Sequence, residues 1–161
     1  MKSVILLLMR DEDKTKEQLI AELRQLRLIE QRSRIIFEQA PIGIAIKELY
    51  ADKFIQVNRA YCDIIGYCRE EVLSDTFKEL TYPHDIRPEL DNMQRLISGE
   101  ISVFKMEKRY IRRDHRVVWV NLTCVPLWIG NEQPVFHIAM IENITDSKRT
   151  VQKGKVEVYH D

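Results

Sequence analysis

The sequence has no excess charge of either sign and few cysteines. Lys plus Arg number 25 and Asp plus Glu number 25, so no strongly basic surface is available to bind the phosphates of a nucleic acid. Cys62, Cys68 and Cys124 show no Cys-x-x-Cys spacing, which argues against a disulfide framework and a zinc site. We therefore predict no nucleic-acid partner and no metal, and the scattered thiols favour a cytoplasmic location.

Long apolar runs and catalytic motifs are also missing. The apolar run at residues 4–9 is far shorter than the roughly 20 residues that cross a bilayer, so we expect no membrane span. It could be the end of a preceding helix or a short strand that covers an edge. With only 5 glycines there is no phosphate-binding loop, and neither a metalloprotease spacing nor a nucleophile elbow occurs. We predict that the chain is not an enzyme.

The composition that remains is that of a globular protein with one core. The chain has 161 residues, of which 45% are hydrophobic and 31% charged, enough for one domain and a peripheral element. We expect the peripheral element at residues 1–33 and the domain at residues 34–149. Residues 150–161 form a tail or the start of a linker; residues 155–159 alternate like a strand, and a disordered tail is the alternative.

The first element is predicted to be an amphipathic helix. Residues 11–34 contain no Gly or Pro, and Leu19, Leu23 and Leu26 follow one another at steps of four and three residues on one face. Glu30 and Ser33 occupy the next positions, so the heptad pattern weakens and a long coiled coil is not expected. The helix either lies on its own domain or forms a short parallel dimer helix. We favour the dimer, because so narrow a stripe suits a partner helix.

Five strands are predicted. The two short strands and three long ones, bounded by turn residues, lie at residues 42–47, 54–57, 103–112, 116–128 and 134–144. Their order predicts an α+β fold: a five-stranded antiparallel sheet with helices on one face. The segment 116–128 is apolar on both faces, so we expect its outer face, which includes Trp119, to meet the amino-terminal helix or a second subunit.

Short helices are predicted between the second and third strands. Asn58 is a good N-cap and Gly66 a good C-terminal stop for a first helix, and residues 70–73 can form another turn. Thr76 and Glu79 have the spacing of a capping box. A longer helix begins between Pro83 and Pro88 and ends before Gly99. Its apolar side is formed by Ile86, Leu90, Met93 and Ile97.

Several phrases, in this order, resemble hallmarks of one family. They are Phe-Glu-Gln-Ala-Pro-Ile-Gly-Ile-Ala (37–45), Val-Asn-Arg-Ala-Tyr (57–61), Ile-Gly-Tyr (65–67), Glu-Glu-Val-Leu (70–73), Thr-Tyr-Pro-His-Asp (81–85), Glu-Lys-Arg-Tyr-Ile-Arg-Arg-Asp (107–114), Val-Trp-Val (118–120) and Asn-Ile-Thr-Asp (143–146). Residues 34–149 thus resemble a PAS domain of the sensory-box type. Residues 14–32 look like the signalling linker helix that precedes PAS domains in bacterial sensor kinases and diguanylate cyclases.

The resemblance implies a sensory module in signal transduction, for example in two-component systems. Such a module would form a homodimer through Leu19, Leu23, Leu26 and Trp119. It would bind a small molecule in its core and relay to an effector domain or a partner kinase or cyclase. The alternative is a structural dimerisation adaptor with a filled core that senses nothing. The predicted signal junction is Asn143, Ile144 and Thr145, where Asn143 replaces the usual Asp and cannot form an ion pair. His115 replaces a turn Gly, so we expect a slightly different turn.

The resemblance also implies an interior pocket, for which we predict an apolar chamber with few charges. One wall comes from the last two strands, with Val120, Leu122, Cys124, His137, Ala139 and Ile141. Facing it we place Ile44, Ile46, Ile55, Ile64, Phe77, Leu80, Met93 and Ile97. His137 could bind a ligand or titrate near neutrality, but we favour a core histidine that is satisfied by one neighbour. For each of the apolar residues we favour packing over ligand contact, because any such core requires apolar side chains at these positions.

Neither of two familiar cofactors fits the resemblance. Light-sensing PAS domains carry a cysteine that bonds to flavin, and Phe77 stands at that position in the phrase Thr-Phe-Lys-Glu-Leu-Thr (76–81). Haem-binding members have a histidine within the long helix, and residues 90–98 contain none. Flavin and haem are therefore disfavoured, and the sequence names no other cofactor.

Overall fold

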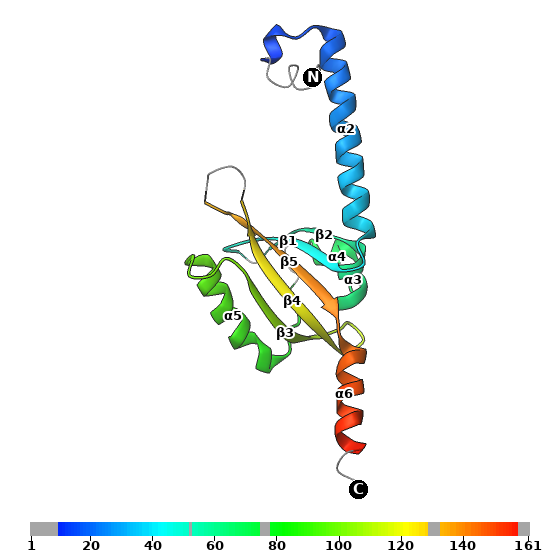
Figure 1. Ribbon diagram of the computed structural model, residues 1–161, viewed down its shortest axis with the longest axis vertical. Helices are drawn as coiled ribbons and strands as arrows, with labels where there is room; N and C mark the ends of the chain where they lie inside the picture. Colours follow the sequence, from blue (N-terminus) through cyan, green and yellow to red (C-terminus); the bar gives the residue numbers. More distant parts are fainter. Residues whose placement is uncertain (1–9, 52, 75–77, 129–132, 158–161) are drawn as a thin grey trace. The chain divides into compact units, whose positions relative to one another are not determined.

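The computed structural model describes residues 10–51, 53–74, 78–128 and 133–157 (Figure 1). The chain divides into two compact units, Met1–Glu38 and Gln39–Asp161, each of which is described by itself. Within the described ranges, no helix is long and apolar enough to span a membrane. The predicted run at residues 4–9 lies outside these ranges.

The first unit consists of a short 3-10 helix, η1 (Asp11–Asp13), and the long helix α2 (Lys16–Gln39). The reciprocal bonds between Thr15 and Gln18 begin α2: the Gln18 amide donates to Thr15 Oγ1 (3.2 Å) and the Thr15 amide to Gln18 Oε1 (2.9 Å). Since no Gly or Pro occurs within it, α2 continues to Gln39. Leu19, Leu23 and Leu26 are 40%, 48% and 50% exposed, so the predicted stripe is uncovered.

The second unit is built on a five-stranded antiparallel sheet in the order β2-β1-β5-β4-β3. The strands are β1 (Gly43–Glu48), β2 (Phe54–Val57), β3 (Phe104–Ile111), β4 (Val117–Leu127) and β5 (Phe136–Asn143). The predicted α+β class and all five strands are confirmed. At the β3–β4 turn His115 adopts φ 64°, a left-handed conformation that His tolerates better than most residues.

The connecting helices are α3 (Arg59–Ile65), α4 (Arg69–Val72) and α5 (Pro83–Ile97). Asn58 caps α3 by accepting from the Tyr61 amide at 3.0 Å, and Gly66 ends it at φ 79°, as predicted. Thr76 lies outside the described residues, so the predicted capping box has no structural account. Helices α3 and α4 contact β1 and β2, whereas α5 lies beside β3 (Figure 1).

The last helix corrects a prediction. Residues 155–159 alternate like a strand, but α6 (Thr145–Glu157) includes residues 155–157. The helix has already begun at Thr145, where the Lys148 amide donates to the Ile144 carbonyl at 3.0 Å, and no Pro follows to stop it. Residues 158–161 lie outside the described ranges.

The phase of β1 is set by its close approach to α3. A Cβ on Gly43 would lie 2.9 Å from the Tyr61 Cα and 2.6 Å from the Ile141 Cγ1, so only glycine fits there. With Gly43 facing the helices, the alternation of the strand also turns Ala45 and Lys47 inward. A lysine is therefore placed on the buried face of the sheet.

Candidate ligand-binding and signalling site

The inner face of the sheet carries two buried lysines. Lys47 on β1 is 4% exposed and Lys108 on β3 is 0% exposed. The Lys47 ammonium lies 4.4 Å from the centroid of the Phe54 ring, and the Lys108 ammonium 4.2 Å from that of Tyr110. Buried lysines are rare unless they are paired with acids.

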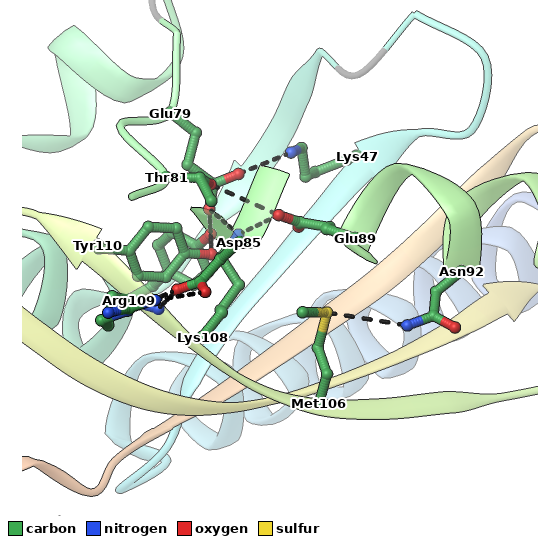
Figure 2. Close-up of polar contacts among 11 residues, drawn as sticks. Lys47, Glu79, Thr81, Asp85, Glu89, Asn92, Met106, Lys108, Arg109 and Tyr110 are labelled. Carbon is green, nitrogen blue, oxygen red and sulfur yellow. Dashed lines mark hydrogen bonds and ion pairs between the residues drawn. The ribbon is translucent and has the colours of Figure 1, made fainter. Parts of the chain in front are cut away.

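Two glutamates supply the opposite charges (Figure 2). Lys108 Nζ donates to Glu89 Oε2 on α5 at 2.6 Å and lies 3.9 Å from Glu79 Oε1. Lys47 Nζ donates to Glu79 Oε2 at 3.2 Å. We call Lys47, Glu79, Glu89 and Lys108 the charge cluster. Its formal charges cancel, which is the condition under which ions are tolerated in a protein interior.

Hydroxyl groups extend the charge cluster. The Tyr61 hydroxyl donates to Glu79 Oε1 at 2.9 Å and lies 3.4 Å from the Tyr110 hydroxyl. Thr81 Oγ1 donates to Glu89 Oε2 at 3.4 Å. Burial, together with the charge of Glu79, raises the pKa of both tyrosines well above the usual value, so both remain neutral hydrogen-bonding groups.

The two glutamates differ in their ionisation. Burial disfavours the charged form of Glu79, but Lys108 and Lys47 outweigh it and hold its pKa well below the usual range. For Glu89 burial prevails over the attraction of Lys108, and repulsion from Glu79 adds to burial, so the pKa of Glu89 is raised. Glu79 is thus the firmly ionised acid of the charge cluster, and Glu89 the one that is incompletely compensated.

A cavity of about 410 Å³ lies between α5 and the charge cluster. Its polar lining comes from Glu79, Thr81, Glu89 and Gln94, and its apolar lining from Leu49, Tyr50, Ile86, Leu90, Met93 and Ile97. Ile86, Leu90 and Ile97 are 44%, 56% and 38% exposed, so the apolar side of α5 is turned to this space and not covered by the core. The volume is that of a small-molecule pocket.

The predicted pocket residues fall into several groups. Met93 and Ile97 line the cavity, and Ile64 and Met93 pack against the core. The predicted wall from the last two strands is buried on the inner face, at Val120, Leu122, Cys124, His137, Ala139 and Ile141. Leu80 is 44% exposed, and Phe77 lies outside the described residues.

Three placements and one property are corrected. Ile44 and Ile46 lie on the sheet face opposite to His137, because Gly43 and Ala45 take the inward positions of β1. Ile55 is 38% exposed, since the buried positions of β2 are its two ends. The interior is also not an apolar chamber with few charges, because it contains the charge cluster.

Two inner-face residues, His137 and Cys124, do not line the cavity. His137 is 2% exposed and stands opposite Lys47 in the β1–β5 register. Burial raises the pKa of the Cys124 thiol to about 12, so this cysteine is an inert packing group. Within the described parts of the chain, no three His, Cys, Asp or Glu side chains are grouped to hold a metal ion.

The outer face of the sheet holds a line of polar and aromatic contacts. Asp85 at the start of α5 accepts from the Arg109 backbone amide at 2.8 Å and from its guanidinium at 2.9 and 2.8 Å. The hydrogen bonds from Arg109 lower the pKa of Asp85. The Arg109 guanidinium lies 4.1 Å from the Tyr82 ring centroid and 4.8 Å from that of Trp119. Lys148 on α6 lies 4.9 Å from the Trp119 centroid.

The predicted signal junction lies at the end of this line. The Trp119 amide donates to Thr145 Oγ1 at 3.0 Å, and the Ile144 amide donates to the Trp119 carbonyl at 2.9 Å. Asn143 Oδ1 accepts from the Thr145 amide (3.0 Å) and hydroxyl (2.7 Å). The side-chain oxygen of Asn143 thus caps the start of α6 by hydrogen bonds and without an ion pair. We call Asp85, Arg109, Trp119 and Lys148 the outer-face contacts.

Comparison with known proteins identifies the family. A family model described as the PAS fold matches residues 54–141, more than half of the chain. The chain belongs to the PAS-fold family. A solved PAS domain from Colwellia psychrerythraea superimposes with a TM-score of 0.64 at 21% identity, over 74% of this chain and 98% of that one. The predicted resemblance is therefore confirmed.

The curated relatives of this PAS domain are signalling proteins. The chain is 37% identical over 132 residues, 82% of its length, to the probable diguanylate cyclase DgcE of Escherichia coli (strain K12). It is 21% identical over 120 residues, 74% of its length, to the sensor histidine kinase TmoS of Ectopseudomonas mendocina. In both cases it spans 12% of the relative's length. This PAS domain is thus a sensory domain of the type found in signalling proteins.

Sequence reasoning did not find the charged residues of this PAS domain. The signal for Lys108 was present: it shares the alternation of Phe104 and Tyr110, both of which are buried. Lys47 shares the inward phase of Gly43, which is fixed by the approach of β1 to α3 and has no signal within the strand. Glu79 and Glu89 have no local signal, because their role depends on lysines that are distant in the sequence.

Proposed function

We propose that this PAS domain binds a small molecule in the cavity beside α5 and relays its occupancy to an effector domain. The cavity carries the proposal, because about 410 Å³ lies within the roughly 300–1,000 Å³ of ligand pockets. Its lining combines an apolar helix face with a few convergent polar groups, the usual design of such pockets. An adaptor with a filled core would need neither feature.

The proposed route of the signal follows the outer-face contacts. α5 lines the cavity, and its first turn carries Asp85, which grips Arg109 on β3. Arg109 and Lys148 both stack on Trp119, so a shift of α5 would alter the support of α6. A switch of this kind needs two arrangements that differ by only a few kcal/mol. The effector that we propose is a cyclase or kinase domain, because the relatives carry those names.

The binding step can be tested with three probes of equal chain length: hexan-1-ol, hexylamine and hexanoate. Calorimetry on the whole chain should detect binding of at least one probe. Leu90→Trp, which fills the cavity, should abolish that binding. Val103→Trp should retain it, because Val103 is 42% exposed and does not line the cavity. If none of the three probes binds the unmodified chain, the adaptor is favoured and the proposal fails.

The relay can be tested by NMR on the same samples. Addition of the tightest-binding probe should shift the backbone amides of residues 145–150. Asp85→Asn, which weakens the grip on Arg109, should reduce those shifts without abolishing binding. Asp91→Asn is the matched control, since Asp91 lies on the exposed side of α5 and pairs with Arg87. Equal shifts in both variants would exclude the outer-face contacts from the route.

We also propose that α2 mediates a homodimer. The exposed stripe of Leu19, Leu23 and Leu26 supports this, since an uncovered apolar stripe suits a partner helix. Leu19→Asp with Leu23→Asp should lower the sedimentation mass to that of a monomer. Ile20→Asp with Leu28→Asp is the control, because these residues are similarly exposed but lie off the stripe. A mass unchanged by the first pair would remove α2 from the interface.

A further inference from the structure

The lining of the cavity presents oxygen atoms and not ammonium groups. Glu79, Thr81 and Glu89 line the cavity, and they form one polar group because both glutamates approach Lys108 and Thr81 donates to Glu89. The lysines do not line the cavity. A molecule that enters therefore meets carboxylate and hydroxyl oxygens before it meets any positive charge.

The ammonium groups are held behind these oxygens. Lys47 and Lys108 have side chains that are only 5% and 0% exposed. Each rests on an aromatic ring, Phe54 for Lys47 and Tyr110 for Lys108, which covers a side of the cation. Figure 2 shows Lys108 and Lys47 directed at the carboxylates. An anionic ligand would have to displace a glutamate to reach either lysine.

Glu89 retains capacity to accept from a ligand. Its Oε2 receives the bonds from Lys108 and Thr81, whereas among the described residues no hydrogen bond to its Oε1 is formed. Its side chain is 21% exposed, and Glu89 lines the cavity. The raised pKa of Glu89 agrees with this geometry, because burial and then Glu79 oppose its charge, and one lysine only partly compensates. A second positive charge next to Glu89 would add to the partial compensation by Lys108.

Apart from the Gln94 amide and the Tyr50 hydroxyl, the rest of the cavity lining is apolar. Ile86, Leu90, Met93 and Ile97 follow one another along one side of α5 and, with Leu49, face the space. These side chains provide no hydrogen-bond partner, so the body of a bound molecule must be hydrocarbon or aromatic. The polar group at one side and this apolar strip together define the two ends of a ligand.

We infer that the cavity selects a small amphipathic cation, in which an ammonium or amidinium head binds Glu89 and an apolar body lies along α5. The inference rests on the proposed function, since it names the class of ligand for the same cavity. A hydrogen bond between two charged groups strengthens binding about tenfold or more over a neutral one. We therefore expect the cavity to select ligands by the charge of the head group and not by the hydrocarbon body.

The three hexyl probes test this inference directly. Calorimetry on the whole chain at neutral pH should give an affinity for hexylamine about tenfold or more above that for hexan-1-ol, with hexanoate weakest. If hexan-1-ol or hexanoate binds as tightly as hexylamine, the inference is wrong while the proposed cavity function stands. If no probe binds, the proposed function fails and the inference fails with it. The comparison needs no variant, so it does not depend on the folding of a mutant.

A variant assigns the preference to Glu89. Glu89→Gln keeps the shape of the side chain and removes its charge, so it should remove the preference for hexylamine over hexan-1-ol. Asp91→Asn, an equal change of charge on the exposed side of α5, should preserve the preference. If Glu89→Gln folds and still prefers hexylamine, or if Asp91→Asn loses the preference, a general attraction to acidic side chains replaces the site at Glu89.

Discussion

The charge cluster predicts a large and pH-dependent cost when one lysine is removed. Lys108 is 0% exposed, and its Nζ lies 2.6 Å from Glu89 Oε2 and 3.9 Å from Glu79 Oε1. Lys108→Met keeps the aliphatic stem, so the loss of packing is small and the loss of charge dominates. Two carboxylates, Glu79 at 10% and Glu89 at 21% exposure, then have Lys47 as the remaining cation of the charge cluster. Breaking a buried ion pair from one side costs about 3–5 kcal/mol, which is the expected loss in the free energy of unfolding at neutral pH.

The cost should shrink as the pH falls. Without Lys108 the pKa of Glu89, already raised, should rise further. A carboxyl whose pKa is raised in the folded state lowers the stability of the protein as the pH rises through that pKa. The lowered pKa of Glu79 in the unmodified chain has the opposite effect: its stability is present above the unfolded-state pKa and is lost on acidification. Both effects reduce the difference in the free energy of unfolding between the unmodified chain and Lys108→Met at acid pH.

Urea unfolding at neutral and mildly acid pH measures these differences. Lys105→Met is the matched control, because Lys105 is exposed on the same strand and its loss should cost within about 0.5 kcal/mol. Adding Glu89→Gln to Lys108→Met should recover part of the stability, since Lys47 and Glu79 then remain as a balanced pair. A cost of Lys108→Met below about 1 kcal/mol, or one that is independent of pH, would refute the reasoning.

Two further predictions concern the core. Gly43→Ala should destabilise the fold by about 1–3 kcal/mol, because the added Cβ meets the Tyr61 backbone. Gly99→Asn should be tolerated in the same unfolding assay, since nothing lies within 4 Å and Asn accepts a positive φ; equal losses would contradict the close-approach argument. A thiol reagent should label exposed Cys68 in the native protein and Cys124 only after unfolding, because the Cys124 pKa is about 12. Mass spectrometry identifies the labelled cysteines. Labelling of Cys124 in the native protein would contradict this prediction and show that the inner face of the sheet becomes accessible.

Local signals predicted the order of the elements correctly. Asn58 caps α3 through the Tyr61 amide, Gly66 ends α3, and Pro83 begins α5. Each of these depends on backbone groups within a few residues, so the sequence contains the whole interaction. Asn58 does more than was predicted: it also accepts from the Ile44 amide at 2.8 Å and donates to the Ile42 carbonyl at 3.0 Å. Those two bonds tie α3 to β1 and have no signal within either segment.

The phase of β1 could not be predicted from its own residues. Ile44 and Ile46 are the larger apolar residues, so burial alone favours turning them inward. The inward phase of Gly43, Ala45 and Lys47 is decided by the distance to α3. A one-residue change of phase exchanges every side chain of a strand between the two faces. This one choice accounts for the misplaced isoleucines and for the lysine that was not expected inside.

The position of the acids on α5 connects the candidate ligand site to the outer face. Asp85 and Glu89 are four residues apart, so their side chains lie one turn apart on the same side of the helix. Glu89 reaches Lys108 on the inner face of β3, and Asp85 reaches Arg109, the next residue, on the outer face. The helix therefore contacts two adjacent residues of one strand, whose side chains lie on opposite faces of the sheet. We expect a ligand that draws Glu89 away from Lys108 to shift α5 and so to alter the geometry of the Asp85–Arg109 pair. Coupling between the cavity and Arg109 then needs only this one helix.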